Sequence, residues 1–168
     1  MTTMFTVHGP HEVPTYRGKA GRTITPEDIQ GFWKSHPALA SQKGCYVFAI
    51  RTGGGFTLGY VGKATKSFRQ EAFAPHKLAK YQQFLVDYVK GTPVLFFLVS
   101  PTKKGKVNSK HISGLEDFLI QKGVAANPEL LNVKGTQQEQ WGIQGILRSA
   151  QGKPSQAARE FKKAMKSS

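Results

Sequence analysis

The sequence predicts an α+β protein in which a small three-stranded antiparallel sheet, made of a hairpin plus one strand, is flanked by helices. Two apolar runs, 45–50 and 56–61, have the composition of strands and are separated by the glycine-rich turn 51–55. The continuous apolar run 94–99 is typical of a strand covered on both faces. A length of 168 residues suits one domain with a core of its own.

Residues 1–43 are predicted to form an N-terminal extension with one short helix. Pro26 and the two acidic residues after it suit a first helical turn, and the helix is expected to end before Pro37. The stretch 8–11 has a Gly-Pro pair between two histidines, which forbids a helix, and is interpreted as a loop.

Helices are expected on both sides of the strand 94–99. A short helix is predicted over 65–73, and a longer one with a regular apolar face begins at Pro75. A third covers 112–122. The folded α+β domain is therefore predicted to span 44–133.

The remaining residues, 134–168, are predicted to be a basic C-terminal extension that ends in a helix.

The chain is strongly basic. Lys and Arg total 24 against 10 Asp and Glu, which gives a formal charge of +14. Such an excess favours a polyanionic partner, nucleic acid first and an anionic membrane second; the alternative is a soluble protein that is merely basic. For the lysine-rich stretch 103–110 and the basic tail from 134, the alternative is a solubilising loop and a solvated helix. The basic residues expected to contact nucleic acid are Lys66, Lys103, Lys104, Lys106, Lys110, Arg148, Lys162 and Lys163.

The single cysteine, Cys45, excludes an intrachain disulfide and a thiolate zinc cluster. The N-terminus lacks the apolar core of a secretory signal, and the longest apolar run, 94–99, is too short to span a bilayer. We therefore expect a cytoplasmic protein with no membrane partner.

The predicted hairpin carries two tyrosines, Tyr46 and Tyr60, one on each strand. Residues far apart in sequence become cross-strand neighbours in a hairpin, so the two phenols are expected to share one site. Lys63 stands beside the glycine at the end of the second strand, where its charge would lower the pKa of a neighbouring phenol or contact a phosphate.

Two further basic side chains follow the hairpin. Arg69 falls in the first short helix, where a guanidinium would clamp a phosphate; the alternative is an ordinary surface arginine. His76 follows Pro75 in the first turn of the next helix, where the helix dipole favours a neutral imidazole able to act as a base or donor.

Glu116 falls inside the apolar stripe of the helix predicted over 112–122. A carboxylate in that position is costly unless it is paired, protonated or bound to a metal ion such as Mg²⁺. The alternative is a capping box with Ser113, which would place Glu116 in the first turn. A helix that starts earlier, at Asn108 or Ser109, would rule out the capping box.

The motifs resemble those of the GIY-YIG nucleases. Gly44-Cys45-Tyr46 corresponds to the first motif of that family, and Tyr60-Val61-Gly62, followed by Lys63-Ala64, corresponds to the second. By the same resemblance, Arg69 matches the family's arginine, Glu116 its metal-binding glutamate and Asn132 its asparagine near the domain end. The match covers about half of the chain, residues 44–132.

The resemblance implies a DNA endonuclease that hydrolyses phosphodiester bonds with one divalent ion, Mg²⁺ or Mn²⁺, held by Glu116. Tyr46 or Tyr60 would help to deprotonate the attacking water, Arg69 would stabilise the phosphorane, and Asn132 would orient the site. His76 lies in the region where some members place a histidine. Two alternatives stay open: a catalytically silent nucleic-acid-binding module and an RNA-directed role on the same fold.

Overall fold

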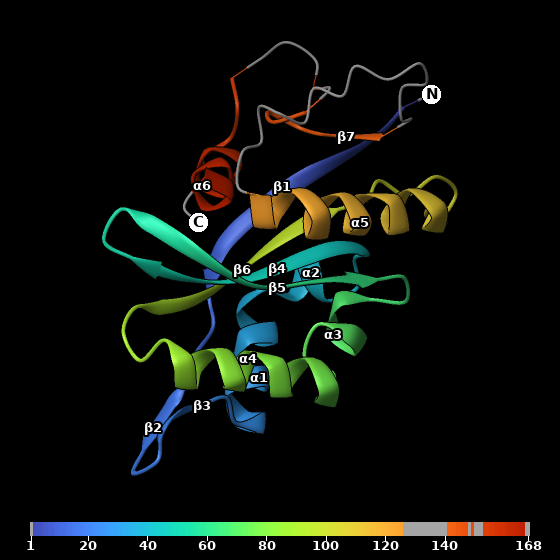
Figure 1. Ribbon diagram of the computed structural model, residues 1–168. Coiled ribbons are helices and arrows are strands. Elements are labelled where there is room, and N and C mark those ends of the chain that lie inside the picture. The colour runs from blue at the N-terminus through green and yellow to red at the C-terminus, as the bar shows by residue number, and fades with distance from the viewer. Residues whose placement is uncertain (1, 126–140, 148, 150–152, 167–168) are drawn as a thin grey trace.

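The computed structural model describes residues 2–125, 141–147, 149 and 153–166. In these residues the chain forms a mixed, curled five-stranded sheet in the order β5-β4-β6-β1-β7, together with a separate two-stranded ribbon, β2–β3 (Figure 1). The strands are β1 (Thr3–Glu12), β2 (Tyr16–Gly18), β3 (Gly21–Thr23), β4 (Gly44–Thr52), β5 (Gly55–Ala64), β6 (Thr92–Val99) and β7 (Trp141–Ile143). The helices are α1 (Pro26–Ser35), α2 (Pro37–Ala40), α3 (Phe68–Glu71), α4 (Pro75–Asp87), α5 (Ser109–Ala125) and α6 (Gln156–Lys166).

The predicted three-stranded antiparallel sheet is wrong. Strand β1 pairs antiparallel with β6, and β7 pairs parallel with β1, so the sheet has two more strands than expected and mixed direction. The missed strand β1 alternates in burial at Phe5, Thr6 and Val7, as a half-buried strand does. Its pairing register shifts between His8 and His11, so the stretch interpreted as a loop is an irregular part of a strand.

Other elements follow the sequence signals. The hairpin of β4 and β5 is confirmed, with Gly53 at φ 52° in its turn. Helix α1 begins at Pro26 behind a capping box between Thr25 and Asp28, and α4 begins at Pro75. Strand β6 is buried along its length because β4 and β1 flank it and helices cover both faces.

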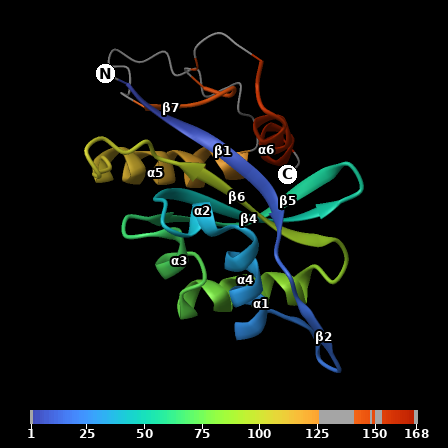
Figure 2. The same ribbon diagram turned by 180° about the vertical axis from the view of Figure 1, so that it is seen from behind.

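Helices α5 and α6 cover one face of the sheet, and α1 to α4 lie against the other (Figures 1 and 2). Successive side chains of β4 therefore enter different cores: Cys45 and Val47 pack with α5 and α6, whereas Tyr46 and Phe48 pack with the other helices. Strand β5 is the edge of this sheet, so side chains from both faces can approach one another around it.

The two ends of the sheet differ. The end of β5, helix α3 and the start of α5 lie together at one end, whereas α6 lies toward the β4–β5 turn (Figures 1 and 2). Helix α6 buries Phe161 against Phe96, with ring centroids 5.0 Å apart. None of the described helices is long and apolar enough to cross a lipid bilayer.

Candidate active site

The hairpin brings the two predicted tyrosines to one face of the sheet. Tyr60 pairs with Phe48, and Tyr46 pairs with Gly62, so both phenols point toward α3 and α4. Their ring centroids lie 6.5 Å apart with the planes inclined by 30°. Tyr46 is fully buried, and its hydroxyl donates a long hydrogen bond of 3.4 Å to the Glu71 carbonyl.

Lys63 and Glu116 approach from the other face. Lys63 pairs with Cys45 and therefore points toward α5. Its ammonium lies 3.7 Å from Glu116 Oε1 and donates a 3.1 Å hydrogen bond to Ser113 Oγ. The edge strand β5 thus has the tyrosines on one side and an ammonium–carboxylate pair on the other.

Helix α5 begins early enough to rule out the capping box of Ser113 and Glu116. Asn108 caps it, since its side-chain oxygen accepts from the His111 amide at 3.1 Å and its carbonyl accepts from the Ile112 amide at 3.1 Å. Glu116 consequently lies in the helix interior.

Glu116 borders the buried stripe of α5. Leu115 and Leu119 are buried, whereas Ile120, expected in the same stripe, is 45% exposed. The stripe is therefore narrower than the sequence suggested, and the Glu116 side chain keeps 19% of its surface exposed. Because the Glu116 side chain is partly exposed, its carboxylate is accessible to a ligand.

The phenols are electrostatically coupled to Glu116. The pKa of Tyr46 is raised, first by burial and then by the charges of Tyr60, Glu71 and Glu116. The pKa of Tyr60 is raised by burial and by Glu116. Both tyrosines are therefore protonated at physiological pH and can donate hydrogen bonds. Burial and the neighbouring acidic groups set the direction of both pKa shifts, and the lowering of a phenol pKa by a nearby cation stays a prediction.

Lys77 is a component of the site that sequence reasoning missed. It lies in the first turn of α4, next to His76, and its ammonium is 5.4 Å from the centroid of the Tyr46 ring. Burial lowers the pKa of Lys77, while Glu71 and Glu116 oppose that shift. Pro75 marks the helix start in the sequence, but only packing shows which first-turn side chain faces Tyr46.

Arg69 and His76, the two other predicted basic residues of the site, are both exposed, on α3 and α4 respectively. Arg69 is exposed on α3 and lines a separate hollow of about 560 Å³ with Trp33 and Lys34. Among the described residues it makes no hydrogen bond or ion pair with the tyrosines or Glu116. His76 is exposed at the start of α4. Asn132, the remaining predicted site residue, lies outside the described residues.

The donor set restricts how a metal ion would be held. Among the described residues there is no group of three or more His, Cys, Asp or Glu side chains that could enclose an ion. Glu116 offers one partly exposed carboxylate, which suits Mg²⁺ or Mn²⁺ bound through one carboxylate, waters and substrate phosphates. The residues present fit such an open site.

The basic residues expected to contact nucleic acid fall into two groups. Lys162 and Lys163 belong to helix α6, and this helix lies toward the β4–β5 turn, away from the end of β5 (Figure 1). Lys66 directly precedes α3, which lies with the end of β5 and the start of α5 at the other end of the sheet (Figure 1). The loop before α5 and its first turn supply the rest of that group, which is Lys103, Lys104, Lys106 and Lys110. Arg148 lies outside the described residues.

Comparisons with family models, with characterised proteins and with solved structures gave no match for this chain. The functional assignment therefore depends on the residues themselves and on their arrangement at the edge of the sheet.

Proposed function

We propose that this protein is a metal-dependent DNA endonuclease whose active site surrounds the end of β5. The observation that carries the proposal is geometric: Glu116 lies 3.7 Å from Lys63 of β5, the strand that also carries Tyr60, and the Tyr60 ring lies 6.5 Å from that of Tyr46. These side chains come from three elements, and the sequence motifs indicate the same chemistry for each of them. The net charge of +14 supports a polyanionic substrate.

Each residue has a role that its surroundings support. Glu116 would hold the divalent ion, which supplies Lewis-acid stabilisation of the phosphate charge when bound. Lys63 and Lys77 place positive charge on either side of the edge strand, where it stabilises the dianionic phosphorane. Tyr60 is partly exposed and neutral, so it would donate a hydrogen bond that orients the attacking water or a phosphate oxygen.

Cleavage of supercoiled plasmid tests the proposal directly. The wild-type protein should convert plasmid to open-circular or linear forms with Mg²⁺ or Mn²⁺ but not with EDTA. Glu116→Gln should lower the single-turnover rate by about a thousandfold, since it removes the charge that holds the metal. Asp117→Asn is the matched control, because Asp117 is the next residue of α5 and is exposed. Equal cleavage by wild type and Glu116→Gln would refute the assignment.

The second candidate is a binding module on the same fold, silent in catalysis or directed to RNA. The placement of Arg69 away from the tyrosines favours it, because the resemblance assigns a catalytic role to that residue. This candidate predicts no cleavage with either metal, together with nucleic-acid binding that weakens steeply with salt. Competition between duplex DNA, single-stranded DNA and RNA for one labelled probe separates its two forms.

A further inference from the structure

The two-stranded ribbon β2–β3 lies at the edge of the molecule, on the far side of α4 from the sheet (Figures 1 and 2). Exposed apolar side chains gather around it: of the five large ones among the described residues, four are Tyr16, Val86, Tyr88 and Val89. The ribbon is also basic, because residues 13–26 include three cations and no acidic residue. Clustered apolar and cationic groups of this kind indicate an interaction surface.

Arg22 fixes the ribbon on the end of α4. Its guanidinium donates hydrogen bonds to the carbonyls of Tyr88 and Gly91, just after that helix. Arg17 pairs with Arg22 across the ribbon, and both line a hollow of about 170 Å³ between the ribbon and α4. Directly opposite residues share one face, so the arginine face of the ribbon lies toward α4.

Tyr16 lies on the other face of the ribbon. Side chains alternate along a strand, so Tyr16 and Gly18 share the face turned away from the arginines. A Cβ atom built on Gly18 would be 3.3 Å from Tyr16 Cε1, so the ring leans along the strand over the glycine. The cross-strand partners Thr23 and Gly21 are small. The ring therefore stays 61% exposed, and a flat group can stack on it.

Positive charge surrounds this ring. Arg17 is exposed in the ribbon, Lys19 is exposed in its turn, and Lys90 is exposed just after α4. Asp87, the last residue of α4, adds one negative charge to this region. An aromatic ring among cations matches a nucleic-acid strand, in which bases stack on the ring and phosphates contact the cations. Bases within a duplex are covered by their neighbours, so the base that stacks here is an unpaired one.

Helix α4 connects this surface with the candidate active site. The helix contacts β3 of the ribbon, and its first turn carries Lys77 beside the Tyr46 ring. Its 13 residues correspond to a rise of about 20 Å, or about six nucleotides of one strand at about 3.4 Å each. One strand of that length can therefore occupy both places.

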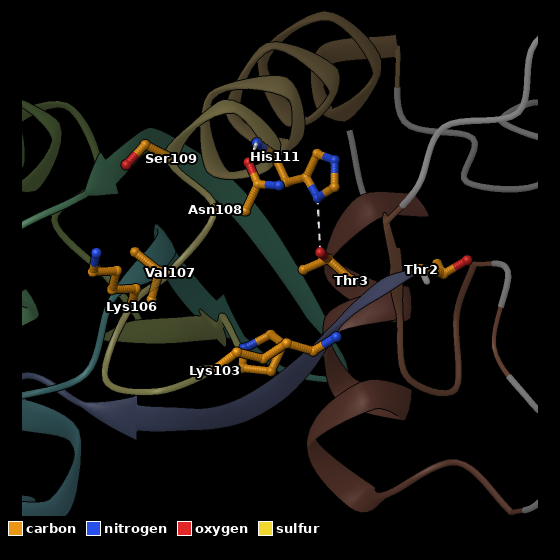
Figure 3. A pocket seen from close by; sticks show the side chains of 9 residues that line it. Thr2, Thr3, Lys103, Lys106, Val107, Asn108, Ser109 and His111 are labelled. Carbon is orange, nitrogen blue, oxygen red and sulfur yellow. Dashed lines mark hydrogen bonds between the residues drawn. The ribbon is translucent and has the colours of Figure 1, made fainter.

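The polar hollow of about 510 Å³ at the start of α5 is less suited to an unpaired base (Figure 3). Lys103 and Lys106 extend to opposite sides there, and His111 Nδ1 is 2.7 Å from Thr3 Oγ1. None of the described residues that line this hollow is Phe, Tyr or Trp. The stacking argument therefore applies to the ribbon.

We propose that the outer face of the β2–β3 ribbon binds an unpaired DNA base stacked on Tyr16, with Arg17 and Lys19 contacting the adjoining phosphates. This inference rests on the proposed function, since it takes DNA as the partner. It adds the substrate class, which is DNA with a single-stranded segment about 20 Å from the bond to be cleaved.

A fluorescent base analogue in single-stranded DNA tests the stacking directly. The probe is a duplex of about 20 bp with a single-stranded tail of about ten nucleotides, a length within the range of single-strand-binding sites. 2-Aminopurine is placed at successive positions of the tail, and binding is measured in EDTA. Wild type should quench the fluorescence at one or two positions, and Tyr16→Ala should not.

Affinity for the same probe supplies a second measurement. Tyr16→Ala should bind the tailed DNA about tenfold more weakly, as expected for one lost stacking contact, whereas Tyr16→Phe keeps the ring and should bind like wild type. Both variants should bind a blunt duplex as wild type does. Val86→Ala is the matched control, because Val86 is 65% exposed beside the ribbon but has no ring.

The outcomes separate the two proposals. Losses confined to Tyr16→Ala and to the tailed DNA, with thermal unfolding unchanged, support the stacking surface whether or not wild type cleaves plasmid. Equal affinities of wild type and Tyr16→Ala for the tail would overturn it, and so would an equal loss for the blunt duplex. Self-association or binding to anionic vesicles that Tyr16→Ala abolishes, with unchanged DNA affinity, would also overturn it. Absence of cleavage by wild type refutes only the endonuclease.

Discussion

The ring of Tyr46 occupies the space that a side chain on Gly62 would need. The two residues are paired across β4 and β5, and a Cβ atom built on Gly62 would overlap the end of the Tyr46 ring. Gly44 of the first motif is constrained in a different way, because its φ of 149° and the nearby Leu98 carbonyl leave no room for a side chain. Both motif glycines are therefore explained by packing around the candidate site.

Gly62→Ala is expected to displace Tyr46 and to lower both stability and activity. Overpacking of this kind costs about 1–3 kcal/mol, and each kcal/mol lowers the unfolding midpoint by about 2–4 °C in a chain of this size. Differential scanning calorimetry measures the shift. Gly54→Ala is the matched control, since nothing lies within 4 Å of a Cβ atom built there. An unchanged midpoint for Gly62→Ala would show that the ring can move aside without cost.

Lys77 is expected to contribute more to cleavage than Arg69. Lys77→Met removes the ammonium beside the Tyr46 ring and should slow single-turnover cleavage by about a hundredfold, the typical effect of losing one charge-stabilising donor. Arg69→Met should slow it less than tenfold, because Arg69 lies in another hollow. A larger loss of cleavage rate in Arg69→Met than in Lys77→Met would mean that Arg69 reaches the substrate only after DNA binds.

Lys63 and a metal ion are expected to compete for Glu116. The ion pair is 3.7 Å long and Lys63 is 42% exposed, so Lys63→Gln should change the unfolding free energy by about 1 kcal/mol or less. The same change removes a positive charge beside the carboxylate and should strengthen Mn²⁺ binding. Electron paramagnetic resonance of unbound Mn²⁺ measures that affinity independently of cleavage. Weaker Mn²⁺ binding by Lys63→Gln would contradict the competition and place Lys63 in support of the metal.

His11 is expected to make the fold less stable in mild acid. Its pKa is lowered to about 4, first by burial and then by His36 and His8, and its ring lies 4.0 Å from that of His36. Below the ordinary histidine pKa, near 6.5, the unfolded chain binds a proton that the folded chain does not bind until about pH 4. Stability therefore falls as pH decreases through this window.

Thermal unfolding at pH 7 and pH 5 measures this effect. The midpoint should fall by a few degrees in wild type, and His11→Phe should reduce the fall because it removes the titrating ring. His76→Gln provides the control, since His76 is exposed. A fall of the same size in His11→Phe would assign the acid sensitivity to other groups.

Local patterns in the sequence predicted the elements that depend on neighbours along the chain. Glycines placed the β4–β5 turn, Pro26 and Pro75 marked two helix starts, and the apolar run 94–99 indicated a covered strand. The strands β1 and β7 were not predicted because they pair with each other across most of the sequence, as Phe5 does with Ile143. In addition, the Gly-Pro pair after His8 interrupts the apolar–polar alternation of β1. Pairing between segments so far apart in the sequence produces no pattern within either segment.

The sequence alone determined the positive charge, the two motif tyrosines on one hairpin and an acidic residue beside an apolar helix stripe. Only the tertiary structure decided that Glu116 lies in the interior of α5, that Lys77 faces Tyr46, and that Arg69 lies elsewhere. The reason is physical. The residue types and their helical or strand repeat determine which side of an element is buried, whereas the contacts of a residue at the edge of that side depend on how two elements pack against each other.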